Sequence, residues 1–145
     1  MKKWIIAAFM CLGAASASAQ WVDVTDPEEL RDMFSGRESI VTTSDGQPWS
    51  SSVNRPDGHG TSTSVRGNLH WARDWVVKGS QVCVQDHLQG WEGIWACRRF
   101  QRHATIKGKY RSILVGEPDD FKTPWPMQKI LNIEVRPAPG YRQTG

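Results

Sequence analysis

The sequence predicts a small antiparallel β-barrel, or a strongly curved sheet, of about eight strands preceded by one short N-terminal helix. Short runs of strand-forming residues follow one another along most of the chain, separated by turns rich in glycine, proline, asparagine and aspartate. Only one segment, near the N-terminus, has the apolar spacing and capping residues of a helix. The 145 residues suit a single domain. Closing such a meander removes its exposed strand edges, which favours a barrel.

Residues 1–19 have the parts of a secretory signal peptide. Two lysines follow the first methionine, residues 4–13 form an apolar run too short to span a bilayer as a mature helix, and Ala17 and Ala19 form an A-x-A pattern before Gln20. We therefore expect cleavage near Ala19/Gln20 and a protein that is periplasmic or secreted.

A lipoprotein signal that ends at Cys11 is the alternative at this terminus. Phe9 and Met10 stand where a lipobox needs small residues, so the signal-peptide interpretation is favoured. No later segment is apolar enough to span a bilayer, so we expect no membrane-spanning segment.

Charge is nearly balanced after the expected cleavage but unevenly distributed. Without the two N-terminal lysines, 16 basic and 15 acidic residues remain, a balance that does not favour nucleic acid as a partner. Residues 20–46 contain seven acidic residues against Arg31 and Arg37, whereas residues 98–111 contain six basic residues and no acidic one. Either these two segments face each other, or the basic run is a surface for an anionic partner.

The sequence DPEELRDMFSG, residues 26–36, predicts the helix. Asp26 can cap its N-terminus, Pro27 suits its first turn, and the two glutamates that follow favour the positive end of the helix dipole. The glycine at the end of the segment stops the helix. Its apolar residues form one stripe at i, i+3 and i+4: Leu30, Met33 and Phe34.

The strands are expected wherever short strand-forming runs lie between turn signals. The serine-rich run at residues 50–52 has the weakest strand chemistry. The expected strands are Glu38–Thr43, Trp49–Val53, Thr61–Arg66, His70–Val77, Val82–His87, Ile94–Phe100, Lys109–Val115 and Met127–Val135.

Alternation along the strands predicts which side chains share a face. Trp71, Trp75 and Val77 share one face of their strand, as do Leu131, Ile133 and Val135 of the last strand. The two prolines around Trp125 indicate a loop. We expect one β-rich domain over residues 20–136 and a flexible tail over residues 137–145.

Two cysteines remain after the expected cleavage, Cys83 and Cys97. An even pair in an oxidising compartment predicts a disulfide, and a separation of 14 residues suits facing positions on two antiparallel strands. A redox pair would more typically have C-x-x-C spacing.

Trp95, Cys97 and Arg99 should point to one side of their strand, with Arg98 and its alternate neighbours on the other. Neither face is cleanly apolar, so we expect the disulfide near a barrel end or beside a bulge.

Several short motifs resemble those of a family of small exported bacterial proteins of unknown function. They are Phe34-Ser35-Gly36, Asp45-Gly46, Asp57-Gly58, the W.V.G..VCV pattern that contains Trp75, Val77, Gly79 and Val82-Cys83-Val84, and Cys97-Arg98-Arg99-Phe100. The similarity covers roughly residues 30–115. The resemblance implies a small antiparallel barrel with an N-terminal helix, and it implies no catalytic residues. The loop around Trp91 and the segment after Gly116 depart from the pattern.

No pattern of catalytic or metal-ligating residues is present. The four histidines, His59, His70, His87 and His103, lack H-x-H or H-E-x-x-H spacing, and no G-x-S-x-G motif occurs. Asp119-Asp120 and Glu92 are the acidic residues that would suggest a carboxylate pair, but Pro118 favours a solvated turn there. We therefore expect no metal site, no cofactor and no enzyme activity.

Tryptophan is unusually frequent, with seven residues after the expected cleavage. Trp71 and Trp75 suit the core of a small barrel. Trp91 and Trp125 lie in expected loops, where they either anchor a partner or cap a barrel end.

Function is expected to be that of an exported envelope-accessory or binding module without catalysis. An inhibitor of a lytic or host enzyme is the first alternative, and a small hydrolase is the second. The partner would be an anionic envelope glycan or lipid, or a protein. The candidate binding surface combines the loop tryptophans with the basic run: Trp91, Trp125, Arg98, Arg99, Arg102, Lys107, Lys109 and Arg111. If the acidic N-terminal helix covers this run, no free patch remains.

Overall fold

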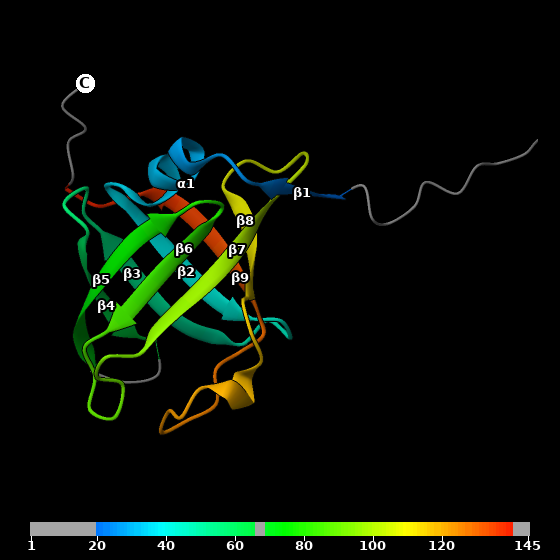
Figure 1. The fold of residues 1–145 in the computed structure, drawn as a ribbon. Helices are drawn as coiled ribbons and strands as arrows, with labels where there is room; N and C mark the ends of the chain where they lie inside the picture. Colours follow the sequence, from blue (N-terminus) through cyan, green and yellow to red (C-terminus); the bar gives the residue numbers. More distant parts are fainter. Residues whose placement is uncertain (1–19, 66–68, 141–145) are drawn as a thin grey trace, which may run out of the picture.

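The computed structural model describes residues 20–65 and 69–140, and it confirms a mainly β fold built around a closed antiparallel barrel (Figure 1). The expected signal peptide, the end of the expected third strand at Arg66, and the last five residues of the expected tail lie outside the described residues.

The barrel is an up-and-down meander in which each strand pairs with the next and the last pairs with the first. Closure comes from seven residue pairs between the first and last barrel strands, from Arg37↔Pro137 to Thr43↔Leu131. Each of the eight expected strands corresponds to one strand of the barrel. The barrel strands are β2 (Arg37–Thr43), β3 (Pro48–Asn54), β4 (His59–Ser64), β5 (His70–Lys78), β6 (Gln81–Asp86), β7 (Trp95–His103), β8 (Lys109–Leu114) and β9 (Ile130–Pro137).

One further strand, β1 (Trp21–Val24), was not expected from the sequence. It pairs with the distal part of β7, from Trp21↔His103 to Val24↔Phe100, and Val24 is buried. This pairing and the one with β8 extend β7 to His103, three residues beyond its expected end. At the other terminus, Pro137 still pairs with Arg37 and Ala138 is buried, so the ordered chain continues past residue 136.

Helix α1 (Pro27–Phe34) closes one end of the barrel (Figure 1). Its expected cap is confirmed, since Asp26 Oδ1 accepts a hydrogen bond from the Glu28 N–H at 3.0 Å. The expected apolar stripe, Leu30, Met33 and Phe34, is buried in the main core. The Phe34 ring stacks on Trp75 at 5.8 Å and meets Phe100 edge-on at 5.3 Å, so α1 acts as a plug.

The barrel interior has two chemically different walls. Strands β2 to β4 present buried hydroxyls, among them Ser39, Ser50, Ser52 and Ser62, and the hydroxyls of Ser52 and Ser62 are 2.7 Å apart. Large apolar side chains come from other strands, among them Trp75 of β5 and Phe100 of β7. Because serine side chains are small, the serine-lined side of the barrel leaves interior space that the aromatic side chains do not fill.

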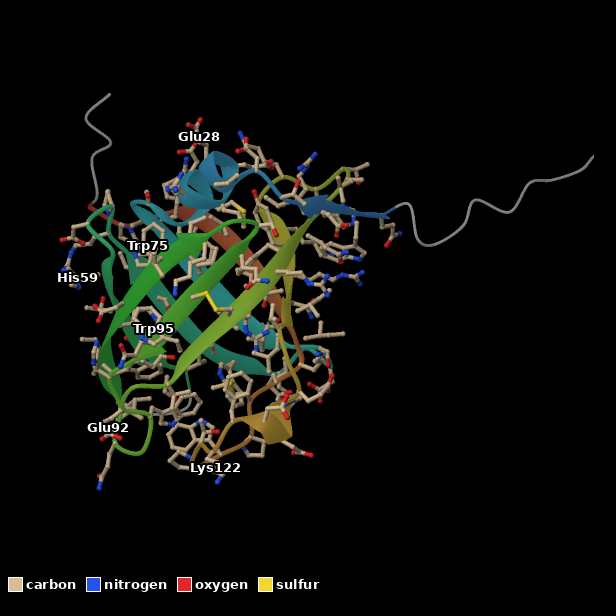
Figure 2. All side chains as sticks on the ribbon, viewed as in Figure 1. Glu28, His59, Trp75, Glu92, Trp95 and Lys122 are labelled. Atoms are coloured by element: carbon tan, nitrogen blue, oxygen red, sulfur yellow. A yellow bond between two sulfur atoms is a disulfide. The ribbon has the colours of Figure 1, made fainter. Side chains whose placement is uncertain are left out.

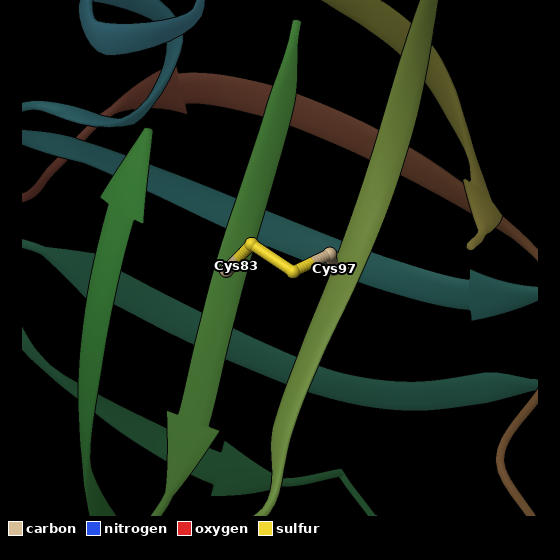
Figure 3. Close-up of a disulfide and its surroundings, with 2 residues drawn as sticks. All are labelled: Cys83 and Cys97. Carbon is tan, nitrogen blue, oxygen red and sulfur yellow. A yellow bond between two sulfur atoms is a disulfide. The ribbon is translucent and has the colours of Figure 1, made fainter. Parts of the chain in front are cut away.

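The disulfide between Cys83 and Cys97 joins directly opposed residues of β6 and β7 (Figure 3). The expected pairing is therefore present, but its expected place was wrong. The two strands stay in regular register from Val82↔Arg98 to Gln85↔Trp95, with no bulge at the cysteines. Both faces of β7 combine polar and apolar residues because Arg98 points into the barrel while Trp95 and Arg99 are exposed.

Candidate ligand cavity

The barrel end opposite α1 opens into an internal cavity. Two segments flank this end, the β6–β7 loop and residues 116–129, which include the short 3-10 helix η2 (Pro118–Asp120) (Figure 1). Glu92 and Lys122 mark these segments at the end of the barrel remote from Glu28 of α1 (Figure 2).

Two adjoining spaces make up the site. The inner cavity lies within the barrel and has a volume of about 130 Å³. The vestibule lies at the open end and has a volume of about 730 Å³. Both are lined by Trp49, Asp86, Trp91 and Gln128, so the vestibule leads to the inner cavity. Their combined size is that of a small-molecule site.

Four tryptophans line the vestibule, and each comes from a different part of the chain. They are Trp49 of β3, Trp71 of β5, Trp91 of the β6–β7 loop and Trp125 of the segment before β9. Trp49 and Trp125 are 38% and 40% exposed, whereas Trp91 is 9% exposed and its ring lies 5.4 Å from that of Trp125. Aromatic faces with free area at an opening bind apolar or planar molecules.

An ion pair lies where the vestibule meets the inner cavity. Arg73 of β5 and Asp86 of β6 are paired across the strands, with Arg73 Nη2 2.8 Å from Asp86 Oδ1. The same carboxylate oxygen accepts a hydrogen bond from Trp71 Nε1 at 2.8 Å. These contacts fix the Trp71 ring and neutralise the charge of Arg73 within the site.

Arg98 is the second cation of the inner cavity and has no carboxylate partner among the described residues. Its guanidinium donates to Ser112 Oγ at 3.1 Å and to the main-chain carbonyl oxygen of Gln128. Burial lowers the pKa of Arg98 from its ordinary value to about 10, so the side chain stays charged at neutral pH. Among the described residues, three ionisable side chains line the inner cavity, Arg73, Asp86 and Arg98, and together they carry one net positive charge.

Two buried polar atoms of lining residues lack a hydrogen-bond partner among the described residues. They are the indole nitrogen of Trp91 and the hydroxyl of Ser39, and both side chains line the inner cavity. A buried donor without a partner is costly, so such groups indicate where an acceptor is missing. The indole N–H donates only, and a bound molecule that satisfies it must offer an acceptor.

The β6–β7 loop contacts the 116–129 segment at Gly90, a position with no room for a side chain. Gly90 has a φ of +85°, and a Cβ at this position would lie 2.5 Å from Pro124 Cγ. The Gly90 N–H also donates to Glu92 Oε2 at 2.8 Å. This close approach holds Trp91 beside Trp125 and shapes the vestibule.

Replacing Gly90 with Ala should displace the 116–129 segment and change the environment of the vestibule tryptophans. The left-handed φ alone costs about 1–2 kcal/mol for a residue with a side chain. Gly93→Ala is the matched control, because Gly93 has a φ of +70° but open space around its Cβ position. We expect both variants to lose stability in urea titrations, and only Gly90→Ala to shift the tryptophan emission maximum. Identical spectra for the two variants would contradict the proposed packing.

The expected binding surface does not form as one patch. On β7, Arg98 points into the barrel and Arg99 is exposed outside it. Arg102 is ion-paired with Glu29 of α1 at 3.0 Å, as expected if the acidic helix covers part of the run. Arg111 stacks on the Trp21 ring at 4.7 Å and donates to Gln101 Oε1.

The two lysines of the run lie far from the loop tryptophans. Lys107 and Lys109 are exposed in and after the β7–β8 turn, which lies on the α1 side of the barrel (Figure 1). Trp91 and Trp125 line the vestibule at the other end. The structure therefore does not bring these residues together, because strand alternation and strand direction separate them. Of the basic run, only Arg98 lies in the cavity with Trp91.

The histidines and acidic residues flagged in the sequence serve local contacts. Asp74 bridges two histidines on the outer face, with Oδ1 2.7 Å from His59 Nδ1 and Oδ2 2.8 Å from His87 Nε2. Hydrogen bonds from His87 and His59 lower the pKa of Asp74. Within the described ranges, no group of three or more His, Cys, Asp or Glu side chains is arranged to hold a metal ion. Asp120 accepts the Glu117 N–H at 2.9 Å and caps η2.

Sequence reasoning missed several residues that line the site. Five strand residues line the site although the sequence did not predict them as binding residues: Trp49, Ser50, Trp71, Arg73 and Asp86. A signal was present for two of them, because Trp71 and Arg73 alternate with Trp75 on the face that was expected to point inward. Their proximity to Asp86 and Trp91 depends on strand register, which the sequence does not display.

In comparisons with known proteins, no family model, no curated protein and no solved structure matches this chain. The resemblance to a family of small exported proteins therefore stays a prediction. In the part of the chain that the structure describes, no helix has both the length and the apolar character needed to cross a membrane.

Proposed function

We propose that this protein is an exported, non-catalytic binding module that holds a small molecule with an apolar body inside its barrel. The observation that carries the proposal is the continuous site formed by the vestibule and the inner cavity, closed by α1 at one end and lined by tryptophans at the other. A rigid, largely pre-formed pocket of this kind is typical of small-molecule sites.

Export is supported by two features. Residues 1–19 have signal-peptide character, and a disulfide is stable in an oxidising compartment. A cell-envelope lipid or another small amphipathic molecule would then be the available ligand class.

The inhibitor alternative has less support. It would be favoured by a filled barrel and by an exposed Trp91 loop that inserts into a partner. Trp91 is instead 9% exposed and packs against Trp125, and the barrel contains a cavity. The hydrolase alternative gains no supporting arrangement, because Asp120 and Glu92 hydrogen-bond main-chain N–H groups of their own turns.

The test uses the neutral fluorescent probe N-phenyl-1-naphthylamine. We expect saturable 1:1 binding with quenching of tryptophan emission, since four tryptophans line the entrance. Ser50→Phe should weaken binding at least tenfold, because Ser50 lines the inner cavity and a phenyl ring would occupy that space.

Ser51→Phe is the matched control, since its side chain is on the other face of β3 and does not line the cavity. We expect its probe affinity to stay unchanged. If Ser50→Phe does not fold, tryptophan quenching in the unaltered protein remains a direct readout. Absence of saturable binding to the unaltered protein, or equal binding by both folded variants, would contradict the proposal.

A further inference from the structure

No carboxylate in the described part of the chain matches the charge of Arg98. Arg73 shares the inner cavity, but its charge is matched by Asp86 at 2.8 Å. Arg98 contacts only neutral acceptors among the described residues, the hydroxyl of Ser112 and the carbonyl oxygen of Gln128. These bonds use two of the five N–H groups that a guanidinium offers.

Burial of this charge works against stability. Desolvation is the cause of the lowered pKa of Arg98, which means that the fold disfavours its charged form relative to water. Buried charges are ordinarily paired, and residues that oppose folding are expected mainly at functional sites. A bound anion would supply the missing partner.

The remaining unpartnered atoms of the cavity favour the same kind of ligand. The side chains of Trp91 and Ser39 line the inner cavity, and the Trp91 indole N–H and the Ser39 hydroxyl have no partner among the described residues. Both can donate to acceptor oxygens, and the indole can do nothing else. One net positive charge suits a monoanion, and the planar guanidinium fork matches the two oxygens of a carboxylate.

We propose that the ligand is a small amphipathic carboxylic acid whose carboxylate binds Arg98 in the inner cavity and whose apolar body lies among the tryptophans of the vestibule. This inference rests on the proposed function and names the ligand class of the same site. The depth of Arg98 inside the barrel sets the orientation, with the carboxylate entering first and the apolar body nearest the opening. In this arrangement, Arg98 is the residue that discriminates acids from their neutral analogues.

The test compares 2-naphthoate with 2-naphthamide, which have the same ring system and differ in charge. Binding is measured by calorimetry and by tryptophan quenching at neutral pH. We expect the unaltered protein to bind the acid at least tenfold more tightly than the amide. Arg98→Met keeps an unbranched side chain of similar length and should remove this preference while retaining affinity for the amide.

Arg99→Met is the matched control, because Arg99 is the exposed neighbour on the same strand. It should keep the preference for the acid. Two results would overturn the role of Arg98 and leave the proposed function standing. The first is equal affinity of the unaltered protein for the acid and the amide. The second is a preference for the acid that survives Arg98→Met. If neither compound binds and the neutral probe also fails, the proposed function falls together with this inference. Should Arg98→Met not fold, the comparison of the two compounds on the unaltered protein still decides the outcome.

Discussion

Replacing Phe34 with Ala should lower the free energy of unfolding by about 3–5 kcal/mol. Phe34 is 5% exposed, stacks on Trp75 and meets Phe100 edge-on, so its ring joins α1 to two barrel strands. Its removal leaves a cavity that the closed barrel cannot collapse to fill. A domain of this size has a total stability of about 5–15 kcal/mol, so the variant should lose a large part of it.

The measurement is a urea or guanidinium titration followed by circular dichroism and tryptophan fluorescence. Asp32→Ala is the control, because Asp32 lies on the exposed side of the same helix. We expect its stability to change by less than about 0.5 kcal/mol. A loss below about 1 kcal/mol for Phe34→Ala would mean that α1 does not act as the plug of the barrel.

Removing the disulfide by replacing both cysteines with Ala should lower the free energy of unfolding by about 3 kcal/mol. The bond closes a loop with a sequence separation of 14, and a loop of this length gives about that value in the chain-entropy model. The strand pairs on both sides of the cysteines remain, so the barrel should still fold below its new midpoint.

A reducing agent provides the control for this prediction. It should destabilise the unaltered protein by a similar amount and leave the double variant unaffected, because the variant has no bond to reduce. Cys83 is fully buried, so its thiol should also resist alkylation in the folded, reduced protein. The prediction fails if protein isolated under oxidising conditions contains two alkylatable thiols, or if the reductant destabilises both forms equally.

Much of the fold follows from local patterns in the sequence. The eight barrel strands, the cap at Asp26 and the buried stripe of Leu30, Met33 and Phe34 agree with the structure, because turn residues, capping and periodicity act over a few residues. The disulfide partners also followed, since only one pairing was available to two cysteines. Strand β1 was missed because its four residues are stabilised by pairing with β7, which is distant in the sequence.

The site was only partly predictable. The sequence singled out Trp91, Trp125 and Arg98, and all three line the inner cavity or the vestibule. It placed Arg98 on an external surface with five other basic residues, although alternation along β7 turns Arg98 inward and leaves Arg99 outside. Composition within a segment does not tell which face of a strand lies inside a closed barrel.

By itself, the sequence determined a β-rich chain with one capped helix, one disulfide pair and an N-terminus with signal-peptide character. Only the tertiary structure decided that β9 closes on β2, that Ser39 and Ser50 face an unfilled space, and that Arg98 meets no carboxylate of the described residues there. The physical reason is the range of the interactions. Turns, caps and periodicity are set by neighbours along the chain, whereas a cavity and the charge balance inside it arise from residues that strand register brings together.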